Sequence, residues 1–143
     1  MARLQISDFE GRWQLDRRIL DRAAGAEMSL TGTAVFRPGG DGRLAYDEEG
    51  DLVMPGGHVL RAERRYDWLF GPDGVSVLFD DGRPFHDFVP EGAAEGSPHP
   101  CGEDLYRVTY DFTAWPVWRA TWDVTGPRKA YRSESRYAPA GPR

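Results

Sequence analysis

Apolar and polar residues alternate along most of this chain, in short segments that end at Gly, Pro or Asp. The alternation is clearest over residues 60–70, where apolar side chains such as Tyr66 and Trp68 are separated by charged ones such as Arg65 and Asp67. A period of two places successive side chains on opposite faces of an extended chain, whereas a helix repeats every three to four residues. The pattern therefore predicts β-strands with one buried face.

The same pattern extends over the whole chain and predicts nine strands joined by turn residues. We place them at about residues 11–22, 28–36, 44–52, 60–70, 75–80, 83–89, 105–112, 117–125 and 129–138. Asp81 and Gly82 form a hairpin-turn signal between the fifth and sixth strands. Residues 90–104 are rich in Pro and Gly, and we expect them to form the one long break without a regular strand.

A helical turn and the closure of the strands complete the predicted fold. Ser7 and Glu10 match the S-x-x-E pattern of a helix start, so we expect residues 6–10 to form a short plug before the first strand. Consecutive antiparallel strands leave two edges, and closure into a barrel removes both. We therefore predict an all-β fold, an antiparallel up-and-down barrel of eight to ten strands that forms a single domain over residues 1–143. Such a barrel can hold one small ligand.

Composition and charge narrow the classes of partner. The chain has 143 residues, of which 40% are hydrophobic, so it can build a core. Its net charge of −5 disfavours nucleic-acid binding, which needs a basic surface. The single cysteine, Cys101, excludes an intrachain disulfide, and no apolar run is long enough to span a membrane. The charged start of the chain does not match a signal peptide, so we expect a cytoplasmic protein.

A motif at the first strand resembles a known superfamily. Phe9, Gly11 and Trp13 form a Phe-x-Gly-x-Trp sequence directly after the expected helical turn. Together with the train of strands, this motif resembles the calycin superfamily of lipocalins and fatty-acid-binding proteins. The resemblance implies that the Trp packs across the closed end of the barrel and that an arginine near the last strand covers it. The candidates for that arginine are Arg128, Arg132 and Arg136.

The whole chain also looks like a small bacterial family of uncharacterised lipocalin-like proteins. The segments that carry this likeness are Arg83-Pro84-Phe85-His86, His99-Pro100-Cys101, Tyr110-Asp111-Phe112 and Gly126-Pro127-Arg128-Lys129. This second resemblance implies no established activity.

Alternation also predicts which side chains face the barrel lumen. The polar ones are Arg17, Glu48, Arg64 and His86, and the aromatic ones that line the cavity with them are Tyr66, Trp68, Phe88, Trp118 and Trp122. A buried charge is costly unless it is paired, which leaves two interpretations of an inward arginine. Either it binds the carboxylate or phosphate of a ligand, or Arg17 or Arg64 pairs internally with Glu48. A register shift at a bulge would exchange inside and outside.

Other candidates for chemistry carry less weight. His86 titrates near neutral pH and could serve as an acid or base, although a lone histidine in a strand is more often structural. His99 and Cys101 lie two residues apart, which supplies at most half of a metal site or a thiol–imidazole pair. A closed metal site needs about four ligands, and nothing in the spacing requires His58 or His86 to converge on this pair, so we predict no metal. No histidine lies near the C-terminus to hold a haem as in some calycin barrels, and we predict no cofactor. The acidic run at residues 47–51 is interpreted as a solvated bend.

We therefore expect a non-catalytic binder of a small, partly apolar molecule, with an anionic group as one option. Arg17, Arg64 and His86 would orient this ligand. One rival hypothesis is an enzyme in the same lumen, with His86 as general base and Arg64 stabilising negative charge. Another is an interaction module whose lumen is filled by side chains. The sequence leaves a homodimer open.

Overall fold

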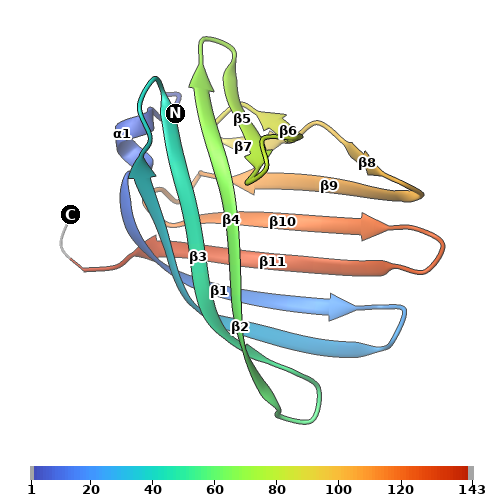
Figure 1. Cartoon of the computed structure of the whole chain (residues 1–143). Coiled ribbons are helices and arrows are strands. Elements are labelled where there is room, and N and C mark those ends of the chain that lie inside the picture. Colours follow the sequence, from blue (N-terminus) through green and yellow to red (C-terminus); the bar gives the residue numbers. More distant parts are fainter. Residues whose placement is uncertain (1, 142–143) are drawn as a thin grey trace.

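The computed structural model describes residues 2–141 (Figure 1). Within this range the chain forms one helical turn and eleven strands, and every paired strand is antiparallel to its neighbour. The elements are α1 (Ile6–Phe9), β1 (Gly11–Asp21), β2 (Ala26–Pro38), β3 (Arg43–Val53), β4 (Val59–Gly71), β5 (Gly74–Phe79), β6 (Pro84–Phe88), β7 (Ala93–Glu95), β8 (His99–Cys101), β9 (Asp104–Asp111), β10 (Trp118–Thr125) and β11 (Ala130–Pro139).

The strands follow one another around a nearly closed barrel. Their order in the sheet is β6-β5-β4-β3-β2-β1-β11-β10-β9-β7, and β8 pairs with β9. The first and last strands meet, because β1 pairs with β11 from Trp13 opposite Pro139 to Asp21 opposite Tyr131. This pairing joins the two ends of the meander, and the predicted all-β antiparallel barrel is confirmed.

The barrel has a seam between β6 and the segment that contains β7 and β8. Both short strands pair with the same edge of β9, and their registers differ by one residue, so together they act as one bulged strand. Among residues 2–141, two hydrogen bonds join β6 to this segment. The backbone N–H of Ser97 donates to the carbonyl of Asp87 at 2.9 Å, and the backbone N–H of Asp87 donates to Ser97 Oγ at 2.9 Å.

The expectation of a stretch without strands at residues 90–104 is wrong, because β7 and β8 lie within it. Both are edge strands whose partner, β9, lies on one side only. An edge strand tolerates proline, which has no N–H to donate, and Pro100 sits in β8 opposite Leu105. These two additional strands account for the difference between the nine strands expected and the eleven found.

Helix α1 closes one end of the barrel (Figure 1). Its last residue, Phe9, is fully buried and contacts six aromatic rings at centroid distances between 5.2 and 5.9 Å. These rings belong to Phe36, Trp68, Phe70, Phe112, Trp115 and Trp118. Trp13 packs across the same end, with its indole N–H donating to the carbonyl of Phe9 at 2.9 Å. The plug expected at residues 6–10 is therefore confirmed.

Two details of this end differ from the sequence expectations. The helix begins earlier than the S-x-x-E pattern suggests, because the backbone N–H of Gln5 donates to the Asp8 carboxylate at 2.6 Å. The three arginines proposed to cover Trp13 do not lie over it. Arg128 is in the turn at the far end of the barrel, Arg132 pairs with Asp123 at that same end, and Arg136 falls on the outer face of β11 opposite Asp16.

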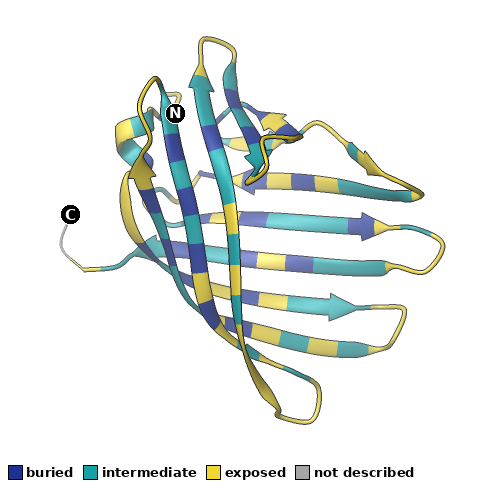
Figure 2. Ribbon diagram, in the orientation of Figure 1, coloured by how far each residue is buried: buried dark blue, intermediate teal, exposed yellow. Residues whose placement is uncertain are grey.

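Buried and exposed residues alternate along the strands, as the period of two requires (Figure 2). The β3–β4 hairpin is an exception, because it extends past the rest of the barrel (Figure 1). Leu60 alternates with Tyr66 and therefore belongs to the inner face of β4, but it is 43% exposed, and its neighbour Val59 is 52% exposed. The tip of the hairpin lies beyond the ends of the other described strands, so its inner face is exposed to solvent (Figure 1).

Candidate functional site

A polar layer crosses the middle of the barrel. Arg17 on β1 donates two hydrogen bonds to Glu48 on β3, from Nη1 to Oε2 at 2.6 Å and from Nη2 to Oε1 at 2.9 Å. The hydroxyl of Tyr46 donates to the same carboxylate at 2.7 Å, and Nε of Arg17 donates to Ser135 at 2.7 Å. Both charged side chains are only 4% exposed. Arg17 thus makes one of the two internal pairs that the sequence allowed.

This pair stays ionised despite its burial. Burial raises the pKa of Glu48, but the hydrogen bonds from Arg17 and Tyr46 and the charge of Arg17 outweigh it and leave the pKa below its ordinary value. Burial would lower the pKa of Arg17, and the contact with Glu48 reverses this effect and leaves that pKa raised. The charges of the layer are therefore satisfied within the protein.

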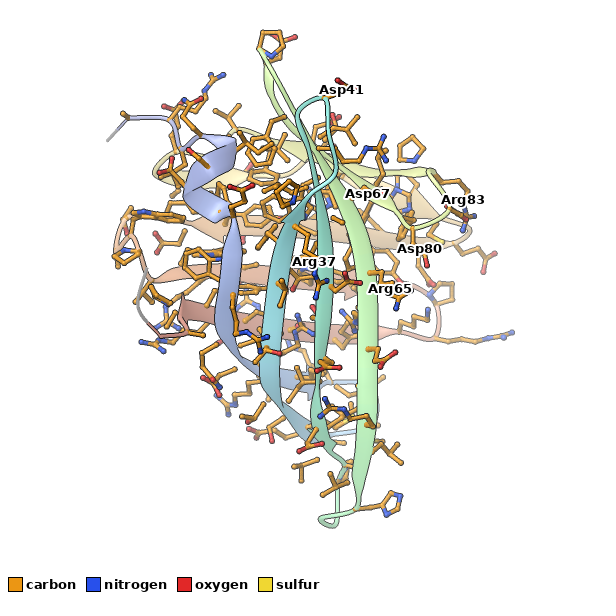
Figure 3. All side chains as sticks on the ribbon, turned by 60° about the vertical axis from the view of Figure 1, so that its left-hand side comes forward. Arg37, Asp41, Arg65, Asp67, Asp80 and Arg83 are labelled. Carbon is orange, nitrogen blue, oxygen red and sulfur yellow. The ribbon has the colours of Figure 1, made fainter. Side chains whose placement is uncertain are left out.

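The acidic run at residues 47–51 is not the solvated bend that was expected. It continues β3 without a break, so Glu48 points inward and its acidic neighbours point outward. On the outer face, Asp47 pairs with Arg37 at 2.7 Å and with Arg65 at 3.0 Å, and Figure 3 shows both arginines on this side of the sheet. One run of sequence therefore serves both faces of the strand.

His86 lies beside the seam and contacts β9. Its Nε2 atom is 2.7 Å from the hydroxyl oxygen of Tyr110. A register shift between Val77 and Leu78 bulges β6, so that Phe85 and His86 are both buried. Burial lowers the pKa of His86 to about 4, and the imidazole is neutral at neutral pH. A group with so low a pKa is a weak proton acceptor.

Little free space remains in the centre of the barrel. A cavity of about 20 Å³ lies between His86, Trp118 and the polar layer, which is room for one water molecule. Nδ1 of His86 and Nε1 of Trp118 are buried and have no hydrogen-bond partner among residues 2–141. Trp118 stacks on Tyr137 with 3.8 Å between the ring centroids. The central lumen is thus packed with side chains.

The barrel opens at the end opposite α1. A partly enclosed pocket of about 550 Å³ lies there, within the range of small-molecule sites. Its aromatic lining residues are Tyr66, Phe79, Phe85, Tyr106, Trp122 and Tyr131. Arg64, Arg83, His99 and Cys101 add the polar groups of the lining. We call this pocket the mouth.

Arg64 on β4 is the polar centre of the mouth. Its guanidinium carbon lies 5.1 Å from the ring centroid of Trp122, in cation–π geometry. In the described part of the chain, Arg64 forms no ion pair with a carboxylate, and its Nη1 atom is buried without a hydrogen-bond partner. The second guanidinium of the mouth, that of Arg83, pairs with Asp81 at 2.7 Å. Within the described residues, the charge of Arg64 therefore has no carboxylate partner.

The residues predicted from the sequence occupy three levels along the barrel axis. Arg64, Tyr66 and Trp122 line the mouth. Arg17, Glu48 and His86 lie in the packed centre. Trp68, Phe88 and Trp118 pack towards the closed end, where Trp68 and Trp118 contact Phe9 and Phe88 contacts Trp68. Apart from Arg64 and Phe88, all the predicted residues also share the lining of the central cavity of about 20 Å³, so they face one lumen, which side chains nearly fill.

Eight residues of the mouth were absent from the predicted site, namely Phe79, Arg83, Pro84, Phe85, His99, Cys101, Tyr106 and Tyr131. Phe85 reaches the interior through the β6 bulge, which breaks the period of two. His99 belongs to β8, a strand that the Pro and Gly content concealed. Tyr131 shares its alternation pattern with Ser133 and Ser135, so its inward position could be read from the sequence.

A larger hollow of about 800 Å³ lies outside the barrel, beside the β4–β5 turn and residues 95–97. Its lining comes from the adjoining ends of β4 and β5, from the end of β6 and from residues 95–97, and includes polar side chains such as Ser76 and Asp87. None of the buried polar atoms without a partner in residues 2–141 belongs to this hollow. We therefore take the smaller mouth as the candidate site.

Two absences hold for the described residues. Among residues 2–141, no group of three or more His, Cys, Asp or Glu side chains could hold a metal ion. His99 and Cys101 do share the lining of the mouth, and Cys101 is an exposed free thiol. Over the same range, the one helix is a single short turn, and no helix has the length and apolarity needed to cross a membrane.

Together these features define a nearly closed antiparallel β-barrel with an aromatic plug, a buried ion pair and an aromatic mouth that holds one unpaired arginine. The chain belongs to a family of unknown function, DUF6314, which it matches over residues 9–139. No curated protein matches it.

Among solved structures, the chain is similar to a protein of unknown function from the DUF3598 family of Nostoc punctiforme, with a TM-score of 0.65 and 14% sequence identity. The match covers 96% of this chain and 49% of that protein, so the chain spans about half of its length. A likeness at this identity shows the fold alone.

Proposed function

We propose that the protein binds a small, partly apolar, anionic molecule in the mouth, with Arg64 holding the anionic group. The observation that carries the proposal is the environment of Arg64, a guanidinium with a buried, unpartnered Nη1 atom over Trp122. A buried polar atom without a partner is costly, and a ligand carboxylate or sulfonate would supply two acceptor oxygens.

Arg17 supports the proposal by contrast. It has the same chemistry as Arg64, but Glu48 and Ser135 already occupy its donors. The two arginines therefore divide between the two roles that an inward arginine can have. Arg17 links β1 to β3 and β11 through Glu48 and Ser135, and Arg64 is the anion-binding group of our proposal.

The low pKa and packed surroundings of His86 favour a binder over an enzyme that uses this residue as general base. The packed centre resembles the filled barrel of an interaction module, but the mouth offers a concave site that such a module does not need. We therefore give binding at the mouth precedence over both alternatives.

We further propose that the barrel is calycin-like. Three features support this assignment: the Gly-x-Trp sequence at Gly11 and Trp13, the helical turn that covers the closed end, and the pairing of the first strand with the last. In such barrels a ligand enters from the open end, which in this chain is the end that carries Arg64.

A titration with 8-anilinonaphthalene-1-sulfonate, a partly apolar monoanion, tests the binding proposal. We expect saturable binding at one site, and weakening by about ten- to a hundredfold in Arg64→Gln, since a hydrogen bond to a charged group is lost. Arg65→Gln is the matched control, because Arg65 is the next residue in β4 but faces outward and pairs with Asp47. Equal affinity in the wild-type and Arg64→Gln proteins would overturn the proposal.

A further inference from the structure

We infer that the ligand preferred by the mouth is a compact, planar aromatic monocarboxylate rather than a long-chain fatty acid or a phosphate ester. This inference rests on the proposed function and names the chemical class of its ligand. Three properties of the mouth carry it: its floor, its walls and its charge.

The floor of the mouth blocks a long ligand. Below Tyr66 and Trp122 the barrel axis is occupied by the polar layer of Arg17 and Glu48, and the cavity at this level measures about 20 Å³. An extended acyl chain would have to displace this bidentate, fully buried ion pair, and separation of such a pair leaves charges without partners. A ligand confined to the mouth must therefore be short.

The walls of the mouth favour flat ligands. Phe79 stacks on Phe85 with 4.8 Å between ring centroids and an interplanar angle of 18°, and Phe85 stacks on Tyr66 at 5.9 Å and 30°. Trp122 meets Phe85 edge to face at 5.2 Å. Aromatic pairs gain from offset stacking and edge contacts that flexible alkyl chains do not make. A planar ring can extend this arrangement.

The charge of the mouth fits a single negative group. Of its two guanidinium groups, that of Arg83 is neutralised by Asp81, and Lys129 at the nearby rim pairs with Asp104 at 3.3 Å. Arg64 then supplies one net positive charge. A carboxylate matches one guanidinium in charge and in two-pronged geometry, whereas a phosphate monoester carries close to two charges at neutral pH.

Tyrosine hydroxyls complete the anion site. Tyr66 and Tyr131 both line the mouth with Arg64. Burial raises the pKa of Tyr66, and it raises the pKa of Tyr131 to about 12, so both hydroxyls keep their protons at neutral pH and can donate to a carboxylate. The site thus combines one cation with neutral donors, which suits a monoanion.

Calorimetric titration with matched probes tests the inference. The probes are 2-naphthoate, its neutral analogue 2-naphthamide, 1-naphthyl phosphate and decanoate, at about pH 8, where the phosphate is a dianion. We expect 2-naphthoate to bind at least about tenfold more tightly than each other probe. In Arg64→Gln the advantage of 2-naphthoate over 2-naphthamide should disappear, whereas Arg65→Gln should preserve it.

The possible outcomes distinguish a wrong ligand class from a wrong binding site. Decanoate or 1-naphthyl phosphate binding as tightly as 2-naphthoate, still in an Arg64-dependent way, would overturn the ligand class and leave the anion site standing. If none of the probes binds the wild-type protein, both the ligand class and the proposed function are overturned. Thermal unfolding of each variant confirms that lost binding does not come from a lost fold.

Discussion

Arg17 and Glu48 join two strands that share no backbone hydrogen bond, because β2 lies between β1 and β3 in the sheet. Their side chains meet inside the barrel behind β2. Both carboxylate oxygens of Glu48 accept hydrogen bonds, one from Arg17 alone and one from Arg17 and Tyr46. The pair therefore acts as an internal brace across three strands.

Removal of one charge of this brace should be far more harmful than removal of both. Glu48→Gln leaves a buried guanidinium without its counter-charge, and we expect the free energy of unfolding to fall by about 3–5 kcal/mol. The double substitution Arg17→Met with Glu48→Met should recover most of this loss, because apolar side chains of similar volume can fill the space. Urea denaturation followed by tryptophan fluorescence measures both.

The matched control for the brace is the exposed pair of Arg18 and Glu27, whose side chains are 57% and 55% exposed. Glu27→Gln should leave the urea midpoint almost unchanged, because water and salt screen a surface ion pair. A double variant no more stable than Glu48→Gln would contradict the role of Glu48 as the counter-charge of Arg17.

His86 should make stability depend on pH below neutrality. Its pKa falls from 6.5 to about 4 on folding, so between these values the unfolded chain binds more protons than the folded one. The contribution of His86 to the free energy of unfolding is therefore fully present above about pH 6.5. It is lost as the pH falls towards 4, by up to about 3 kcal/mol. Urea denaturation at a series of pH values gives the slope.

A difference profile isolates this contribution from that of the carboxylates. The stability of the wild-type protein minus that of His86→Gln should be constant above about pH 6.5 and should decline below it. His58→Gln is the control, because His58 is exposed in the β3–β4 turn and its replacement should leave the profile unchanged. A flat difference between pH 4 and 6.5 would rule out a buried, neutral imidazole.

Phe9 should contribute strongly to stability although α1 has only four residues. The ring is fully buried among six others at the closed end. Phe9→Ala removes these contacts and leaves a cavity, so we expect a loss of about 3–5 kcal/mol in the free energy of unfolding. Phe9→Leu should lose less because it fills more of the space. A loss below about 1 kcal/mol in Phe9→Ala would show that the closed end does not need its plug.

Gly32 and Gly50 should resist substitution because β2 and β3 approach each other closely there. The two residues lie opposite each other, and a Cβ on Gly32 would collide with the backbone oxygen of Glu49. We expect Gly32→Ala to lower the free energy of unfolding by about 2–3 kcal/mol. Gly71→Ala is the control, because no heavy atom of residues 2–141 lies within 4 Å of a Cβ placed there. Equal stability of the two variants would refute the close approach.

The barrel itself could be predicted because burial of one face imposes a period of two on the sequence. The same rule placed Arg17 and Glu48 on the inner face and allowed their pairing. The period of two could not decide whether Glu48 on β3 pairs with Arg17 on β1 or with Arg64 on β4. That choice depends on how far each of these strands is shifted lengthwise relative to β3, and alternation does not specify this shift. Glu48 lies opposite Arg64 in the β3–β4 ladder, yet it bonds to Arg17.

The mouth was harder to predict because it is built where the regular pattern fails. The bulge of β6 turns Phe85 inward beside His86. A strict alternation of inward and outward residues cannot predict two consecutive inward side chains. His99 reaches the mouth from a strand that contains Pro100. Leu60 follows the alternation but is exposed, because the β3–β4 hairpin extends past the rest of the barrel.

The brace of Arg17 and Glu48 lies between the plugged end of the barrel and the mouth, where we propose that a ligand binds. The fully buried rings lie on the plug side of the brace, whereas the residues of the mouth are mostly half-exposed. Changes at the mouth should therefore alter ligand preference at small cost in stability. If the mouth is the binding site, substitutions there can change ligand preference during evolution, while selection for stability conserves the residues of the plugged end.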